Sequence, residues 1–584
     1  MEASNPKAQR LMAMVQGHLE AGAPDLAYGV GAAGCRQFPD IAPLLELTAL
    51  AAAQSGQLDA SSQLFERAHN LEPDNTRLAY NLATVYQSLN QFSRARKLLE
   101  RCLKLDPNHG AAHANLGAVL SIFGELDLAL THLDQSSKLG HDSPEVHTNR
   151  GNALRDQGFV ESALEAYRAA LTLAPDFEVA QSNYLLCLNY SATLTQAEVL
   201  EAHRSWGAQA VSEQPKPAPR YRSHDKIRIG YVSPDFRRHS CAYYLRGLFT
   251  HHNRSRFEVT AYSNVTREDE VTKFFKTRAD HWRPITEFNH SHVMEMIAED
   301  EIDILVDLAG HSAHNRLSLF QRPIAPVQVT YLGYPNTTGL ETMNYRIGDV
   351  ITDPTDEQSV EEIIRLPNCF LCYQPDENIP PIALPPHTQR GFVTFGSFNL
   401  LAKLTDEVIG CWADILCATP QSRLFLKTKQ FASEGARERI LSLLASRGIA
   451  RERIELRSHV ASLDEHLSLY GEIDLALDPF PYNGTTTTCE ALVMGVPVLS
   501  LHGDRHAARV GSSLLSTVGL ESTIAKDRDS YINRAIELAT HPEQLLQLRD
   551  GLRARVLDSP LCDPVEHTKS FEAILESLLA ARTR

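Results

Sequence analysis

A run of threonines after an Asn-Gly pair could bind the phosphates of a nucleotide. The stretch DPFPYNGTTTTCEALVMGVPVLS follows a strand predicted to end at Asp478 and opens a helix predicted to start near Cys489. Helix N-termini present free N–H groups and the positive end of a dipole, so they hold phosphates. An ordinary N-cap needs a single threonine, and the extra hydroxyls therefore favour a nucleotide site. The predicted loop residues are Gly484, Thr485, Thr486 and Thr487.

Charged and polar residues near this loop could bind the rest of a nucleotide diphosphate. Glu490, at the start of the same helix, could accept hydrogen bonds from a ribose diol. Lys403 follows a strand in SFNLLAK, where an ammonium would balance the charge of a departing diphosphate. On spacing alone, a solvated surface lysine remains the alternative. The predicted nucleotide-sugar site also includes Asn399, His466 and Arg509.

A second group of residues combines histidine with aspartate after two other strands, in SPDFRRHS and LVDLAGHSAHNR. Histidine near its unperturbed pKa suits proton transfer, although a lone histidine is more often structural. The spacing of His311 and His314 could hold a metal, but the sequence shows no third ligand, so we expect none. The residues predicted on this side are Asp235, His239, Asp307, His311 and Arg316.

Strand-like runs alternate with helical stretches around these motifs, which predicts parallel sheets covered by helices. The runs KIRIGYVS, FEVTAYSN, IDILVDLAG and PVQVTYLG belong to one unit. A second unit contains GFVTFGSFN, SRLFLKTK, RIELRSHV, IDLALDPF and VPVLSLHG. Ligands of such sheets bind outside the carboxyl ends of the strands. The sequence therefore predicts a site in the cleft between the two units.

A 34-residue period occupies the first third of the chain, with asparagine at Asn81, Asn115, Asn149 and Asn183. Small residues in phase and proline between units are typical of tetratricopeptide repeats, here about six. Asparagine is a poor helix former, so its recurrence needs a reason. Its amide can pair with the backbone of an extended peptide, which predicts a groove for protein acceptors. The alternative is that these amides bond between neighbouring helices and bind nothing.

Composition limits the partners of the chain. A formal net charge of -16 argues against a general nucleic-acid binder, because such proteins present a basic surface. The start MEASNPKAQR lacks a signal-peptide pattern, and no apolar run is long enough for a membrane span. Ten cysteines without a disulfide rhythm fit reduced thiols and a cytoplasmic location. We expect neither nucleic acid nor membrane among the partners.

The repeats and the motifs SPDFRRHS, GHSAHNR, PVQVTYLGYPNTTG, FGSFNLLAK and DPFPYNGTTTTCEAL resemble the protein O-GlcNAc transferase and SPINDLY family over nearly the whole chain. The resemblance implies a GT-B fold and inverting, metal-free transfer of one sugar from a nucleotide sugar to Ser or Thr of intracellular proteins. It implies that His239 is the active-site histidine, Lys403 the diphosphate-stabilising lysine and Glu490 the ribose-binding acid. The threonine loop would hold phosphates, and the asparagines would hold acceptor peptides.

The chain departs from the O-GlcNAc branch at Leu400, Leu463 and Thr485, where that branch has glutamine, lysine and histidine. There it resembles the SPINDLY branch, whose plant members transfer fucose from GDP-fucose. The implied donor is GDP-fucose, with UDP-GlcNAc second. Asp307 or a water chain is the alternative proton acceptor if His239 orients the sugar. A catalytically inactive repeat scaffold and a transferase for small acceptors or asparagine are the other hypotheses.

The predicted fold class is α + α/β, a repeat superhelix followed by a GT-B fold of two Rossmann-like domains. Residues 1–211 form the repeats and 212–225 a proline-rich linker. Residues 226–385 form the acceptor-side domain and 386–562 the nucleotide-sugar-side domain. Residues 563–584 form a helix that packs back on the body. A homodimer through the repeats is also expected.

Overall fold

The computed structural model describes the chain except residues 1–4, 211–218, 220, 222–223 and 584. Most of the predicted linker, 212–225, therefore lies outside the described residues. The described chain divides into two compact units. One takes the residues up to Leu154 together with Ala169–Pro175, and the other takes Arg155–Arg168 and the residues from Asp176 onward.

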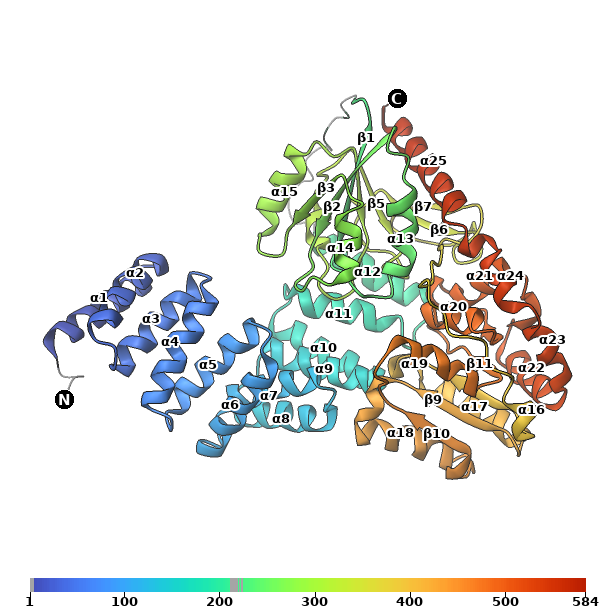
Figure 1. Ribbon diagram of the computed structural model, residues 1–584, viewed down its shortest axis with the longest axis horizontal. Helices are drawn as coiled ribbons and strands as arrows, with labels where there is room; N and C mark the ends of the chain where they lie inside the picture. Colours follow the sequence, from blue (N-terminus) through green and yellow to red (C-terminus); the bar gives the residue numbers. More distant parts are fainter. Residues whose placement is uncertain (1–4, 211–218, 220, 222–223, 584) are drawn as a thin grey trace. The chain divides into compact units, whose positions relative to one another are not determined.

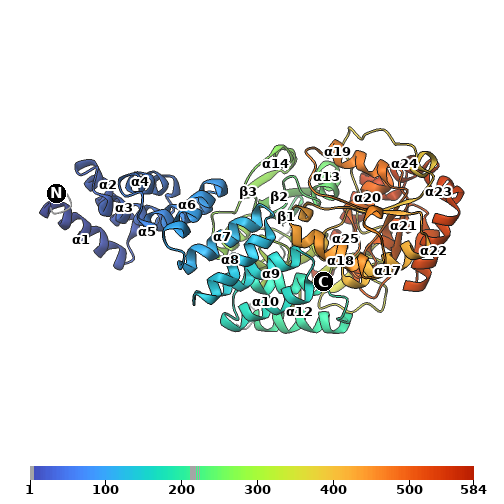
Figure 2. The ribbon, with the colours of Figure 1, turned by 90° about the horizontal axis from the view of Figure 1, so that it is seen from below.

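Helix pairs make up the first third of the described chain, as the 34-residue period predicts (Figures 1 and 2). The turn inside each of the first five pairs needs a residue in the left-handed region. Four of these turns use glycine, and the remaining one uses Asn90, with φ 56°. The helices are α1 (Pro6–Glu20), α2 (Pro24–Gln37), α3 (Ala42–Gln54), α4 (Leu58–Leu71), α5 (Thr76–Ser88), α6 (Phe92–Leu105), α7 (Gly110–Ile122), α8 (Leu126–Lys138), α9 (Pro144–Asp156), α10 (Val160–Leu173), α11 (Glu178–Leu188) and α12 (Gln196–Ala210).

A seven-stranded parallel sheet follows, in the order β3-β2-β1-β4-β5-β6-β7. The pattern of apolar runs predicts β1, β2, β4 and β5, whereas β3, β6 and β7 are additional. Its strands are β1 (Ile227–Ser233), β2 (Phe257–Ser263), β3 (His281–Pro284), β4 (Ile304–Asp307), β5 (Val327–Tyr331), β6 (Tyr345–Asp349) and β7 (Glu362–Leu366). Its helices are α13 (Ala242–His251), α14 (Glu270–Lys276) and α15 (His290–Glu299).

A six-stranded parallel sheet forms the second lobe, in the order β10-β9-β8-β11-β12-β13. Its strands are β8 (Thr394–Ser397), β9 (Arg423–Lys427), β10 (Ile454–Arg457), β11 (Leu475–Leu477), β12 (Val498–Leu501) and β13 (Ile524–Ala525). Its helices are α16 (His387–Arg390), α17 (Asp406–Ala418), α18 (Glu434–Ala445), α19 (Leu463–Ser468), α20 (Thr486–Val493), α21 (Val510–Thr517), α22 (Arg528–Thr540), α23 (Pro542–Arg549) and α24 (Leu552–Leu557).

The last helix, α25 (Pro564–Thr583), returns to the first lobe and lies along α13, β5 and β7 (Figure 1). Its apolar side chains Phe571 and Leu575 are fully buried in the core of that lobe. The chain thus crosses to the second lobe and back, which ties the two sheets together. No helix among the described residues is long and apolar enough to cross a bilayer.

Candidate functional site

The threonine loop lies at the carboxyl end of β11, and α20 begins at Thr486, earlier than the start predicted near Cys489. The threonines therefore form the first turn of the helix itself. The Thr488 hydroxyl donates to the carbonyl of Gly484 at 3.1 Å, which closes that turn. The N–H groups of this first turn have no acceptor within the helix, which is an arrangement that a phosphate could use.

Buried polar groups hold this loop in place. The Asp478 carboxylate accepts from the N–H of Gly484 and from the Ser500 hydroxyl, both at 2.6 Å. Asn483 is fully buried, donates to the Pro479 carbonyl at 2.9 Å and accepts from the N–H of Gly511 at 3.1 Å. A Cβ on Gly484 would lie 2.5 Å from the Thr487 hydroxyl, so a larger residue here would have to displace that side chain.

Lys403 ends a short 3-10 helix, Leu401–Lys403, that follows β8. Its Nζ donates to the Asn483 carbonyl at 2.6 Å and lies 4.2 Å from the centre of the Tyr482 ring. The side chain is buried, with 9% of the residue exposed. Burial lowers the pKa of Lys403, and the nearby Asp478 carboxylate limits that decrease. The ammonium thus lies directly beside the threonine loop.

Glu490 belongs to a buried hydrogen-bond network one turn into α20. Its Oε2 accepts from the Tyr470 hydroxyl at 3.1 Å and lies 3.0 Å from His466 Nε2. Lys427 Nζ is 2.9 Å from the other ring nitrogen of His466. No described residue donates to Oε1 of Glu490, so one oxygen remains for a ligand. Asn399 joins the same region, because its Oδ1 accepts from the Thr487 hydroxyl at 3.1 Å.

On the first lobe, Asp235 and His239 come together in the loop after β1. His239 Nδ1 is 3.4 Å from Asp235 Oδ1, and the His239 side chain is 37% exposed whereas Asp235 is buried. Burial lowers the pKa of His239, although the Asp235 carboxylate opposes the shift. Burial likewise raises the pKa of Asp235, and His239 opposes that shift. The accessible imidazole is therefore the group that can meet a substrate.

Ligand atoms of Asp235, His239 and Cys241 lie within 4.8 Å of one another, which is a spacing that a metal could use. The Cys241 N–H points to His239 Nδ1 at 3.3 Å and competes with a metal there. Burial also raises the pKa of the Cys241 thiol well above its usual value, which disfavours the thiolate. Both features disfavour a metal at this cluster.

The two groups of residues face each other across the lobes. Tyr244, in the first turn of α13, has its hydroxyl 3.1 Å from the Thr486 hydroxyl at the start of α20. Because α13 begins directly after the His239 loop, this contact brings that loop close to the threonine loop. The lobes thus bring together Lys403, the threonines and His239, which are far apart in the sequence.

Two residues predicted on the acceptor side are instead buried in the scaffold. Asp307 is 1% exposed and accepts from the Ala309 and Gly310 N–H groups and the Thr330 hydroxyl. Burial raises the pKa of Asp307 to about 6, but no face of it is open to substrate. His311 is fully buried between Ser182 and the Thr338 carbonyl, and burial lowers its pKa to about 3. Both side chains are therefore enclosed by protein partners in this structure.

Two predicted arginines also hydrogen-bond to other protein groups. Arg316 donates to Asn264 and to the carbonyls of Ile285 and Thr286, so it joins loops of the first lobe. All three guanidinium nitrogens of Arg509 donate to protein acceptors, including the Glu357 carboxylate at 2.6 Å. The geometry gives both arginines structural positions. Their spacing in the sequence carries no sign of these partners.

The asparagines of the repeats lie on α5, α7, α9 and α11 and are all half-buried. The Asn81 amide donates to Glu46 at 3.5 Å, and that of Asn115 donates to Thr84 at 3.3 Å. These bonds use one donor each, as the alternative of interhelical bonding predicts. Each amide still has an acceptor and a second donor, so a peptide role stays a prediction.

Sequence reasoning missed the residues that support Lys403, namely Asp478, Tyr482, Asn483 and Tyr190. The motif DPFPYNG contains the first three, but nothing in its spacing shows that they surround a lysine 75 or more residues earlier.

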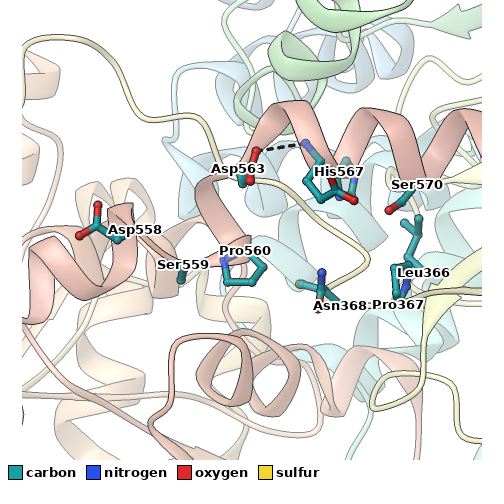
Figure 3. A pocket seen from close by; sticks show the side chains of 11 residues that line it. Leu366, Pro367, Asn368, Asp558, Ser559, Pro560, Asp563, His567 and Ser570 are labelled. Atoms are coloured by element: carbon teal, nitrogen blue, oxygen red, sulfur yellow. Dashed lines mark hydrogen bonds between the residues drawn. The ribbon is translucent and has the colours of Figure 1, made fainter.

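A cavity of about 160 Å³ beside the start of α25 contains none of the predicted residues (Figure 3). It is lined by residues that include Asp563 and His567, and the backbone N–H of His567 donates to the Asp563 carbonyl there.

Two parallel α/β lobes with a C-terminal helix that returns to the first lobe are the arrangement of a GT-B glycosyltransferase fold. The chain belongs to glycosyl transferase family 41, because the model of that family matches residues 209–378 and 386–571. Tetratricopeptide repeats match residues 52–101, 90–151 and 144–177. The O-GlcNAc transferase and SPINDLY resemblance is therefore confirmed.

The SPINDLY-named relatives are the more similar branch. A protein from Solanum lycopersicum named probable UDP-N-acetylglucosamine–peptide N-acetylglucosaminyltransferase SPINDLY is 43% identical over 70% of this chain and 45% of its own length. The corresponding SEC protein of Arabidopsis thaliana is 29% identical over 61% of this chain and 37% of its own length. A solved mutant of Thermobaculum terrenum O-GlcNAc transferase has a TM-score of 0.82 and 32% identity, and the match covers 87% of this chain and 98% of that one. The chain spans less than half the length of these curated relatives.

Proposed function

We propose that this chain is an inverting protein O-glycosyltransferase that moves one sugar from a nucleotide sugar to Ser or Thr of protein acceptors. The observation that carries the proposal is the buried Lys403 ammonium beside the threonine turn of α20. A cation and a helix N-terminus at one point are suited to a diphosphate. Family membership and the names of the relatives support the same class of reaction.

The proposed chemistry is a direct displacement at the anomeric carbon. The acceptor hydroxyl oxygen forms the new bond while the bond from the sugar to the diphosphate breaks, and the diphosphate leaves with the electron pair. Lys403 and the N–H groups of α20 stabilise that negative charge. Such preformed donors are usually the largest single contribution to catalysis.

His239 is the proposed group near the acceptor hydroxyl. Its imidazole is the accessible member of the pair with Asp235, whereas Asp307 is enclosed by three donors. Burial lowers the pKa of His239, so its imidazole stays neutral, and able to accept a proton, at lower pH than an ordinary histidine. Either His239 takes the proton, or it orients the sugar and a water chain takes the proton.

For the donor, we propose GDP-fucose first and UDP-GlcNAc second. The higher identity to SPINDLY-named relatives and the departures at Leu400, Leu463 and Thr485 support the first. Leu400 is 44% exposed beside Lys403 and cannot hydrogen-bond a base or sugar as glutamine would. The printed names of the relatives, which specify UDP-N-acetylglucosamine, support the second.

We further propose that extended acceptor polypeptides bind along the repeats, that no metal is needed, and that the enzyme acts in the cytoplasm, as a dimer through the repeats. The remaining amide capacity of Asn81 and Asn115 supports the first of these statements. The alternative of an inactive repeat scaffold requires that the site bind no nucleotide, which a direct measurement can decide.

The test is a calorimetric titration of the purified chain with UDP and GDP in parallel, each with and without EDTA. We expect tighter binding of GDP that EDTA does not change, followed by transfer of a deoxyhexose from GDP-fucose to peptides, read by mass spectrometry. Preference for UDP would move the donor to UDP-GlcNAc. Loss of binding with EDTA would contradict metal-free action, and binding of neither nucleotide would support the scaffold.

A further inference from the structure

An aromatic pair connects the last repeat to the proposed catalytic lysine. Tyr190 follows α11, and its ring stacks on that of Tyr482, with centroids 4.8 Å apart and planes 15° apart. Tyr482 precedes the Asn-Gly bend of the threonine loop, and its ring is the one that Lys403 Nζ approaches at 4.2 Å. A side chain of the repeats thus reaches the donor site through one intermediate ring.

The Lys403 ammonium needs a stabilising neighbour that does not consume its donors. Among the described residues, its hydrogen-bond acceptor is the Asn483 carbonyl, which leaves two N–H groups for phosphate oxygens. The Asp478 carboxylate, whose charge acts on Lys403, is already bonded to Gly484 and Ser500. An aromatic face attracts a cation through its quadrupole and accepts no conventional hydrogen bond. The Tyr482 ring can therefore keep Lys403 charged without competing with the diphosphate.

The turn that carries Tyr190 is fixed to the first lobe as well. The neighbouring Asn189 donates to the Tyr334 hydroxyl at 3.0 Å and accepts from the Asn336 amide at 2.8 Å. Tyr190 itself is 7% exposed, so its ring has little freedom to move. This turn therefore sets the plane of the Tyr482 ring from a rigid base.

We propose that Tyr482 is a positioning residue that holds the Lys403 ammonium in its charged, diphosphate-binding state, and that Tyr190 of the last repeat fixes Tyr482 for this task. The proposal rests on the proposed nucleotide-sugar site. It means that the repeats contribute to the donor site as well as to acceptor binding. No described residue hydrogen-bonds the Tyr482 hydroxyl, so the ring alone carries the effect.

In the described part of the chain, four titratable groups act on Lys403 or Tyr482. Asp478 is the charged group near Lys403, and Tyr190, Tyr334 and Cys241 lie near enough to Tyr482 to affect its phenol. Loss of the ring should lower the pH at which Lys403 loses its proton. Nucleotide binding should then weaken at a lower pH, because only the ammonium pairs with the diphosphate.

The experiment measures the affinity of the full chain for the nucleoside diphosphate that it binds, UDP or GDP, from pH 6 to pH 10 by calorimetry. We expect the alkaline loss of affinity to move down by about one pH unit in Tyr482→Leu, since a buried cation–π contact is comparable to one unit of pKa. Tyr482→Phe, which keeps the ring, should restore the wild-type position. Tyr190→Leu should move the loss in the same direction by less. The nucleotide's own titration is the same for the wild-type chain and for every variant. It therefore cancels when their pH profiles are compared.

An unshifted alkaline loss in Tyr482→Leu would overturn the proposal, as would a shift in Tyr482→Phe equal to that in Tyr482→Leu. Thermal unfolding checks that each variant is folded. If Tyr482→Leu does not fold, Tyr482→Met replaces it as the variant without an aromatic ring. A shift in Tyr482→Leu without one in Tyr190→Leu would remove the repeat from the proposal. Failure of the wild-type chain to bind either nucleotide would instead overturn the proposed function and this inference with it.

Discussion

At the scale of single residues, the proposed site is built around Lys403, a lysine whose side chain is buried. The Lys403 ammonium has lost most of its hydration, and burial lowers its pKa. Among the described residues, its contacts are a carbonyl and a ring face, and none forms a direct ion pair with it. A lysine held in this way is ready for an anion, because a diphosphate would supply the charge and the acceptors that the protein withholds.

Lys403→Ala should therefore lower kcat by about 10²–10³-fold, or roughly 3–4 kcal/mol of barrier, as for a lost oxyanion-hole donor. The measurement is steady-state transfer to a peptide with the donor that the titration identifies. The exposed Lys429 of the same lobe provides the matched control, Lys429→Ala, which should keep wild-type kinetics. Activity of Lys403→Ala within about tenfold of wild type would show that this role is wrong.

At the scale of elements, two helix starts and one repeat surface organise the function. α20 begins at the threonines and α13 begins just after His239, and Tyr244 connects these two starts. Along the repeats, the asparagine-bearing helices place one amide per unit. The Asn81 and Asn115 amides each donate one hydrogen bond to a neighbouring helix, and these bonds orient them in the absence of a peptide. Pre-oriented donors lose less entropy on binding.

The triple variant Asn81→Ala, Asn115→Ala and Asn149→Ala should raise KM for a long polypeptide acceptor at least tenfold, if each lost hydrogen bond contributes about 0.5–1.5 kcal/mol. KM for the nucleotide sugar should not change. Asn108→Ala, at an exposed position outside this phase, is the control. Unchanged turnover of the long acceptor would favour a small-acceptor enzyme and leave the amides with a structural role alone.

At the scale of the whole molecule, a buried ion cluster holds the two lobes in contact. Asp353 of the first lobe accepts from Arg346 at 2.7 Å and lies 2.8 Å from His506 Nδ1 of the second lobe. Although burial raises the pKa of Asp353, the charges of Arg346 and His506 hold it below its usual range. Such a cluster is costly to break because each remaining charge is then buried without a partner.

Asp353→Asn should destabilise the two-lobe unit by about 3–5 kcal/mol, because Arg346 would lose its carboxylate. Urea unfolding followed by tryptophan fluorescence should show an earlier midpoint, whereas Asp356→Asn, exposed in the same loop, should unfold like wild type. An unchanged midpoint for Asp353→Asn would show that the cluster does not hold the lobes together.

Sequence patterns alone indicate the local features. The 34-residue period predicts the helix pairs, apolar runs predict the central strands of both sheets, and the Asn-Gly-threonine pattern predicts the helix start near the site. Each of these depends on neighbours within a few dozen residues, where propensity and periodicity act. Motifs that follow strands make Lys403, Glu490 and His239 candidates, and the family resemblance favours Lys403 and His239 over ordinary surface or structural residues. The edge strands β3, β7 and β13 and the inner strand β6 are not predicted, because each is short and lacks a continuous apolar run.

Sequence patterns do not show which of the chemically suitable residues are accessible. Asp307, His311, Arg316 and Arg509 have the right types in the right loops, but partners distant in sequence enclose each of them. The support of Lys403 by Tyr482, and of Tyr482 by Tyr190, likewise joins three regions of the chain. Burial and hydrogen-bond partners arise from packing between distant segments, and packing is what separates a ligand-binding side chain from a structural one.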